Sequence, residues 1–166
     1  MLIEVMVVLG LFFALIGLAS LANTNDALVE ARPADPRAAI KAVALDGPNW
    51  CDFEVAGESY YQAALRSVAG EGGEDGVSHH CRARLVHEYG NPHDANAIRV
   101  EIEGLHVGYL PAHRAGQFRK QMQAMGHEGR DATCAAFING GWSDRSSQGH
   151  YGVKLGLHWP VRERTT

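Results

Sequence analysis

The sequence has neither an excess of positive charge nor paired cysteines. Its 166 residues carry 15 Lys and Arg against 19 Asp and Glu, a net charge of -4, which excludes a broadly basic protein that coats duplex nucleic acid. Cys51, Cys81 and Cys134 are an odd number of cysteines without CxxC spacing, which argues against a secreted disulfide framework and a zinc ribbon. The remaining composition, 46% hydrophobic and 20% charged, is typical of a globular protein.

An uncharged apolar run opens the chain. Residues 5–22 read VMVVLGLFFALIGLASLA, and residues 1–22 are long enough to cross a hydrocarbon layer of about 30 Å. We expect a transmembrane anchor, or an uncleaved signal, over residues 1–22. A cleaved signal peptide competes, because Ser20-Leu21-Ala22 suits a cleavage site, but Glu4 is the only charged residue before the run and a basic flank is missing.

The charges that follow the run predict its orientation. Arg32, Arg37 and Lys41 lie within about 20 residues after the span and no Lys or Arg precedes it. We therefore expect a single-pass protein of the inner (cytoplasmic) membrane whose C-terminal domain faces the cytoplasm. Residues 2–8 also resemble the start of the type IV pilin helix, which would place the domain outside, but the basic leader and the Phe-Thr pair of that pattern are missing.

Proline and turn residues separate this run from the rest. Residues 23–49 contain Pro33, Pro36 and Pro48 and little apolar periodicity, so we expect a linker there. Residues 50–164 then form one compact domain.

Within this domain, short stretches of alternating apolar and polar residues are separated by turn formers. This pattern predicts strands over 51–57, 77–89, 96–102, 105–110, 132–138 and 151–158, with helices over 60–69 and 112–125. The fold class is therefore mainly β: a small OB-like β-barrel of about six strands with one or two helices, preceded by the transmembrane helix.

Four motifs stand in order along the domain. They are Val55-Ala56-Gly57-Glu58-Ser59-Tyr60-Tyr61, Asn91-Pro92-His93-Asp94-Ala95-Asn96-Ala97-Ile98, Val107-Gly108-Tyr109-Leu110-Pro111 and Tyr151-Gly152-Val153-Lys154-Leu155. In this order and spacing they resemble the HIRAN domain. The resemblance implies a modified OB-like barrel, found alone in bacteria and fused to helicases in eukaryotes, that binds the 3′ hydroxyl end of single-stranded DNA without catalysis.

Carried over by position, the resemblance assigns roles to five residues. It implies that Tyr60 stacks on a base, that Asp94 contacts the terminal hydroxyl and that Tyr151 packs on the DNA end. Ser59 stands where the eukaryotic pattern has a backbone-contacting Arg, and His93 stands where it has a second stacking Tyr. The first departure removes a phosphate contact, whereas the second keeps a flat ring.

Elementary chemistry leaves alternatives to these roles. An Asp carboxylate accepts a hydroxyl proton and repels an additional phosphate, but Asp94 and Asn96 can equally hydrogen-bond their own turn. Tyr60 is either a stacking platform or a core residue. Arg82, Arg84 and Lys154 are candidate phosphate contacts on the sheet, or ordinary surface charges.

The sequence thus predicts a membrane-tethered, non-enzymatic module that binds single-stranded DNA ends without a cofactor. Its rival is a protein-interaction or envelope domain with an unidentified protein partner, which the net acidity and the departures at Ser59 and His93 favour. A metal-dependent hydrolase rests on nine histidines alone, among which His79, His80 and Cys81 are the densest cluster. Adjacent strand residues face opposite sides, so the three cannot ligate one ion together.

Overall fold

The computed structural model describes residues 41–165, which are mainly β. Eight strands, two α-helices and one 3-10 helix follow one another within this range: β1 (Val43–Asp46), β2 (Phe53–Glu54), η2 (Glu58–Tyr61), α1 (Gln62–Ala69), β3 (Val77–His87), β4 (Ile98–Ile102), β5 (Leu105–Tyr109), α2 (Ala112–Ala124), β6 (Ala132–Gly140), β7 (Tyr151–Gly156) and β8 (Arg162–Glu163).

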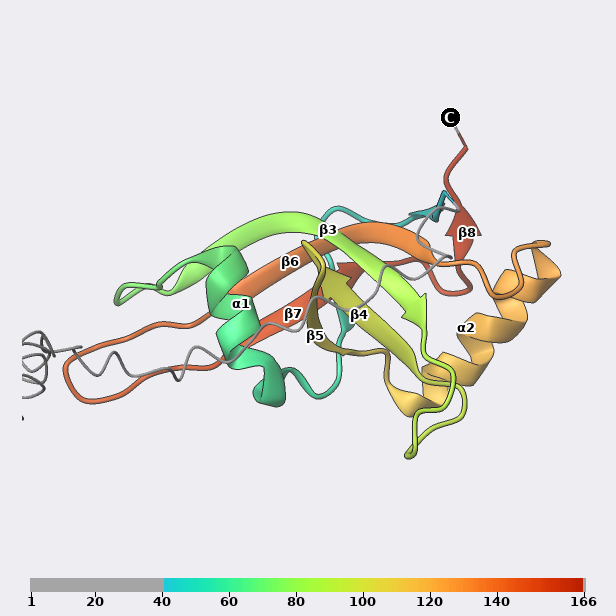
Figure 1. Cartoon of the computed structure of the whole chain (residues 1–166). Coiled ribbons are helices and arrows are strands. Elements are labelled where there is room, and N and C mark those ends of the chain that lie inside the picture. The colour runs from blue at the N-terminus through green and yellow to red at the C-terminus, as the bar shows by residue number, and fades with distance from the viewer. Residues whose placement is uncertain (1–40, 166) are drawn as a thin grey trace, which may run out of the picture. The chain divides into compact units, whose positions relative to one another are not determined.

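The strands form one sheet that curls back on itself. Its order is β2-β7-β6-β3-β4-β5, and β1 pairs in parallel with β6 and antiparallel with β8. The two ends of this path meet where Ala56, just after β2, bridges Tyr109 at the end of β5. Ala56 N donates to Tyr109 O at 2.8 Å and Tyr109 N donates to Ala56 O at 2.9 Å. The result is a barrel-like sheet closed at one point (Figure 1).

Buried apolar residues alternate with partly exposed residues along the strands, and the buried side chains fill the inside of the curled sheet. In β6, Ala132, Cys134, Ala136 and Ile138 are buried while the residues between them are partly exposed, as expected for a sheet with one solvated face. The helices lie near opposite ends of the long strands (Figure 1). Each contributes apolar side chains to the same core: Leu65 from α1, and Ala115, Phe118 and Met122 from α2.

Glycine permits one tight turn and one close approach of strands in this curled sheet. The β4–β5 hairpin turns at Glu103 and Gly104, both at positive φ (52° and 80°), which is the conformation of the tight turns preferred by hairpins. Gly108 has φ 152°, and a Cβ there would lie 2.5 Å from Val55 Cγ1 and 2.8 Å from Ala56 O. The absence of a side chain at Gly108 therefore lets β5 approach the residues that close the sheet.

The mainly β prediction is confirmed, and the strand pattern is corrected at its two edges. Residues 43–46, expected to belong to the linker, form β1, and their Val43 and Leu45 are fully buried. The β8 strand was not predicted, because two exposed residues carry no alternation. The strand expected over 51–57 shortens to β2, since Cys51 and Gly57 have positive φ values of 44° and 80°.

The expected transmembrane helix and its pilin-like start lie outside the described residues. Within residues 41–165, neither α-helix has the length and apolar character needed to span a bilayer.

Candidate functional site

A surface cleft of about 380 Å³ lies where the two ends of the sheet meet. Its lining comes from segments far apart in the sequence: Ala56 and Gly57 after β2, Tyr60 and Tyr61 of η2, Asn91, His93, Asp94 and Ala97 of the β3–β4 connection, and Tyr109, Leu110 and Ala112 from the end of β5 to the start of α2. We call this the aromatic cleft. It brings together Tyr60, His93 and Asp94, three of the residues singled out from the sequence.

The β3–β4 connection is a turn held by its own side chains. Asn91 Oδ1 accepts hydrogen bonds from the backbone N–H groups of His93 (2.9 Å) and Asp94 (3.1 Å), and Asp94 Oδ1 accepts from Asn96 N at 2.8 Å. The turn role suggested for Asp94 is therefore real. It uses only one carboxylate oxygen, since Asp94 Oδ2 makes no hydrogen bond within residues 41–165, and a carboxylate has acceptor sites on both oxygens.

Tyr60 stands at the rim of the aromatic cleft. Its side chain is 88% exposed, so the alternative of a core packing residue does not apply. Gly57 at φ 80° begins η2, whose first turn is closed by Tyr60 N donating to Gly57 O at 3.0 Å. An exposed tyrosine on a short, hydrogen-bonded turn presents a ring face to solvent. Ser59, its neighbour, is also exposed but is not part of the cleft lining.

The inner wall of the cleft is a cluster of rings. Tyr61 packs against His106, with centroids 4.0 Å apart, and the His106 ring meets Tyr109 edge-on at 4.7 Å. Burial, together with the neighbouring Glu88 carboxyl, raises the pKa of Tyr109 well above its usual range, so this hydroxyl stays protonated at neutral pH. The wall is therefore aromatic, and its Tyr109 hydroxyl contributes no charge.

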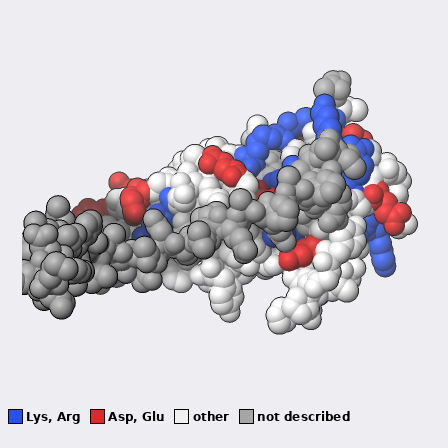
Figure 2. All heavy atoms as spheres, viewed as in Figure 1, with Lys and Arg blue, Asp and Glu red and all other residues white. Residues whose placement is uncertain are grey.

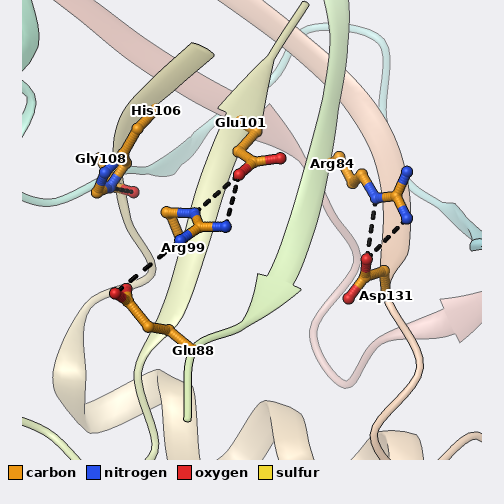
Figure 3. Close-up of polar contacts among 7 residues, drawn as sticks. All are labelled: Arg84, Glu88, Arg99, Glu101, His106, Gly108 and Asp131. Carbon is orange, nitrogen blue, oxygen red and sulfur yellow. Dashed lines mark hydrogen bonds and ion pairs between the residues drawn. The ribbon is translucent and has the colours of Figure 1, made fainter. Parts of the chain in front are cut away.

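A buried ion-pair network supports this wall. Arg99 lies opposite Tyr109 on β4 and donates from Nε and Nη2 to Glu101 Oε1 at 2.8 and 2.7 Å, with Glu88 Oε1 3.9 Å from its Nη1 (Figure 3). His106 Nε2 lies 3.1 Å from Gly108 O. Two carboxylates thus neutralise Arg99, which packs behind the cleft.

Tyr151 has a different role from the one implied by the family resemblance. Its ring is 3% exposed and belongs to the core. Its hydroxyl donates to Gly70 O at 2.9 Å, and its backbone N–H donates to Gln62 Oε1 at 2.8 Å. Tyr151 therefore ties β7 to α1 and is not part of the cleft.

The basic candidates on the sheet also lie outside the cleft lining. Arg84 is paired with Asp131, with its Nη2 2.8 Å and its Nε 3.0 Å from Oδ2 (Figure 3), and Arg82 donates to Thr133 Oγ1 at 3.0 Å. Lys154 on β7 faces Glu54 of β2 in register. Figure 2 shows Lys and Arg gathering towards the end of the domain where Figure 1 places β8 and α2, with acidic side chains between them.

The number of histidines was the basis of the hydrolase alternative, and Cys81 belonged to their densest cluster. Within residues 41–165, no three His, Cys, Asp or Glu side chains are grouped so that they could hold a metal ion. Burial raises the pKa of the Cys81 thiol to about 11 and that of Cys134 to about 12. Both thiols are therefore protonated at neutral pH, whereas metals bind the thiolate.

The fold and cleft define a class: a small, barrel-like β domain with an open aromatic binding cleft bordered by a turn carboxylate. A family model describes that class more closely. The HIRAN domain model matches residues 49–134, more than half of the chain, and the protein belongs to the HIRAN family. This is a family of nucleic-acid-binding modules. No match was found among curated proteins or among solved structures.

Two aromatic residues of the cleft were not identified as site residues from the sequence. Tyr61 was expected within the helix over 60–69, and Tyr109 within the strand over 105–110. A signal for Tyr109 existed in the motif Val107-Gly108-Tyr109, because an aromatic ring next to a glycine that needs a close approach marks a crowded edge of the sheet. No local sequence pattern predicts the position of Tyr61 in the cleft, since only the tertiary fold brings its ring against His106.

Proposed function

We propose that this HIRAN domain binds the 3′ end of single-stranded DNA in the aromatic cleft. The observation that supports it most is the convergence of Tyr60, His93 and Asp94 on one cleft of about 380 Å³. Tyr60 and His93 are both exposed and present flat rings for bases. Stacking on such rings contributes about 1–3 kcal/mol per base and tolerates any sequence.

Asp94 supplies the distinction between a strand end and a continuing strand. Its Oδ1 is engaged by Asn96 N, while Oδ2 accepts the hydrogen bond of a terminal 3′ hydroxyl. A phosphate in the same place would bring negative charge against the carboxylate, which discriminates against it by repulsion. The domain acts by binding alone and catalyses no reaction.

The test compares two short oligonucleotides that differ only in a 3′ hydroxyl or a 3′ phosphate, by fluorescence anisotropy with the full-length chain in mild detergent. We expect the protein to prefer the hydroxyl. In D94N the Oδ1 contact to the turn is retained but the negative charge is lost, so this preference disappears. Equal binding of the two oligonucleotides by the unsubstituted protein would overturn the proposal.

Asp144 provides a matched control for this substitution. Its Oδ1 likewise accepts from the backbone two residues on, Ser146 N at 2.7 Å, in an exposed turn that does not line the cleft. D144N therefore makes the same chemical change in the same local motif. We expect it to keep the preference for the 3′ hydroxyl.

A protein-interaction module is the second candidate, and one observation favours it. Within residues 41–165, the lining of the aromatic cleft includes no Lys or Arg, so an apolar side chain of a peptide would fit there as well as a base. The same titration separates the two functions. Absence of binding to either oligonucleotide, even at low salt, would favour a protein partner.

Membrane tethering is a separate proposal, because it rests on residues 1–22. The uncharged run and the positive charges at Arg32, Arg37 and Lys41 support a single-pass anchor in an inner membrane, with the domain on the cytoplasmic side. A topology reporter fused after Thr166, in a bacterial host, tests this. Reporter activity on the outer face only would overturn the cytoplasmic placement.

A further inference from the structure

A second hollow, of about 420 Å³, adjoins the aromatic cleft. Ala112 lines both hollows. The β3–β4 turn also separates and borders them, with Asp94 on the side of the cleft and Asn96 on the side of the second hollow. We call the second hollow the α2 groove, because residues 112–123 of α2 supply most of its lining.

One face of α2 forms the floor of this groove. Ala112, Gly116 and Lys120 are four residues apart and therefore lie one above another on the helix. The first two are small and leave the helix surface open. From Ala112 to Lys120 the helix rises about 12 Å, the axial length of three to four stacked nucleotides at about 3.4 Å each.

The charge of the groove suits an anion. Arg119 and Lys120 line it, against the single carboxylate of Glu128. Within residues 41–165, the ion pairs between side chains involve neither Arg119 nor Lys120. Arg84 and Arg99 of the sheet, in contrast, are neutralised by carboxylates. Arg119 and Lys120 therefore outnumber the carboxylates that line the groove, which adjoins the aromatic cleft.

Arg119 is also held in place. Its Nε donates to Asn96 O at 2.9 Å and its Nη2 to Ala97 O at 3.1 Å, while its Cζ lies 4.9 Å from the centroid of the Tyr89 ring. Arg119 therefore couples α2 to the turn that carries Asp94. Tyr89 is 57% exposed and its ring stacks near-parallel on His87, with centroids 6.0 Å apart. A partly exposed ring and a fixed cation therefore stand together in the groove, as single-strand binding requires.

We infer that the α2 groove binds the nucleotides that lead up to the 3′ end. The strand enters along α2 past Lys120 and Tyr89, crosses at Ala112, and ends at Asp94. This inference rests on the proposed function of the aromatic cleft and adds to it a direction for the strand and a footprint of several nucleotides.

The test measures affinity against oligonucleotide length. Unlabelled oligothymidylates of about 2 to 8 nucleotides with a 3′ hydroxyl compete with a labelled strand for the full-length chain, again by anisotropy. We expect the affinity of the unsubstituted protein to rise with length and then level off. In K120Q we expect the longest strand to lose about tenfold, while the shortest keeps its affinity and the 3′ hydroxyl preference is unchanged.

Gly116 supplies a second variant and its matched control. A Cβ at this position would meet the Asn96 side chain, with Nδ2 at 3.6 Å and Cγ at 3.7 Å, which are ordinary contacts, and replacing a helical glycine favours the helix. G116E places a long acidic side chain in the groove and should remove the gain with length. G116A keeps the groove open and should leave it unchanged.

The outcomes separate this inference from the proposed function. A gain with length that survives in both K120Q and G116E, with the 3′ hydroxyl preference intact, would overturn the groove alone. If affinity no longer rises with length in either variant, and the unsubstituted protein shows no preference for the 3′ hydroxyl, the result would support strand binding in the α2 groove and overturn end recognition. No binding of any length by the unsubstituted protein would overturn both.

Discussion

Asp94 uses one of its two carboxylate oxygens to hold its own turn. Oδ1 closes the turn through Asn96 N, and Oδ2 makes no hydrogen bond within residues 41–165, which is why we propose that it accepts the terminal hydroxyl. Tyr60 and Tyr151 are the same residue type in opposite environments. Tyr60 is 88% exposed, whereas Tyr151 is 3% exposed. At this scale a shared residue type says little about function, and exposure separates the ring that is proposed to bind from the ring that packs in the core.

Substituting these two tyrosines should therefore affect different properties. Y60A is expected to weaken single-strand binding by about 1–3 kcal/mol without lowering the melting temperature, because the ring packs against little. Y151F loses the hydrogen bond to Gly70 O and should lower the free energy of unfolding by about 1 kcal/mol, with affinity unchanged. Anisotropy and thermal unfolding measure the two effects, and a loss of affinity in folded Y151F would contradict the assignment.

The buried Cys134 thiol makes stability depend on alkaline pH. Burial raises its pKa from the ordinary 9.0 to about 12, so above pH 9 the unfolded chain releases a proton that the folded chain retains. The free energy of unfolding therefore does not depend on this thiol below pH 9. Between pH 9 and 12 it falls with rising pH, by up to about 1.4 kcal/mol per pH unit. Urea unfolding measures the free energy of unfolding at about pH 8 and about pH 10.5. The loss of stability between these two pH values should be smaller in C134V than in the unsubstituted protein. Equal differences would contradict this expectation.

At the scale of elements, the cleft depends on how two sheet ends meet. The Ala56–Tyr109 bridge brings η2 beside the end of β5, and the β3–β4 turn reaches the same place because β3 and β4 pair next to β5. Gly108 makes this approach sterically permissible. The cleft is therefore a consequence of closure, and a change that opens the bridge disturbs three lining segments together.

Adding a methyl group at Gly108 tests this dependence. In G108A the new Cβ meets Val55 Cγ1 and Ala56 O at 2.5 and 2.8 Å, so we expect the free energy of unfolding to fall by about 2–3 kcal/mol. G104A is the control, since Gly104 has a similar need for positive φ (80°) but nothing within 4 Å of a Cβ, and should cost about 1 kcal/mol. Equal costs in urea denaturation would show that closure does not limit position 108.

At the scale of the whole molecule, charge is sparse and placed locally. The net charge is -4, and the sheet arginines Arg84 and Arg99 are paired with carboxylates. Within residues 41–165, the cations that line the two hollows are Arg119 and Lys120 of the α2 groove. The proposed association with a single strand therefore relies on stacking and end recognition more than on phosphate contacts.

The salt dependence of binding reports this balance directly. With two phosphate contacts, at Arg119 and Lys120, the slope of log K against log salt should be about -1.4, and K120Q should reduce its magnitude by about 0.7. K154Q, which removes a charge outside both hollows, should leave the slope unchanged. A slope steeper than about -4 would place the strand on the arginines of the sheet.

Local patterns in the sequence determined the β class, the β4–β5 hairpin and the family. Alternation over residues 77–87 and 132–138 indicates which face of a strand meets water, and Glu103-Gly104 is typical of a tight turn. Both patterns are local in the sequence, so they can be predicted without knowledge of the tertiary structure. The motif around Asn91 to Ile98 points to the family for the same reason, because its turn is built from residues close in sequence.

Long-range pairing decided the rest. β1 was hidden in the expected linker because its burial depends on β6 and β8, more than 80 residues further along the chain. Tyr151 was assigned to the ligand and lies in the core, because only packing against α1 buries its ring and satisfies its hydroxyl. The aromatic cleft and the α2 groove are likewise tertiary, since each joins segments whose proximity arises only when the sheet curls and closes at Ala56 and Tyr109.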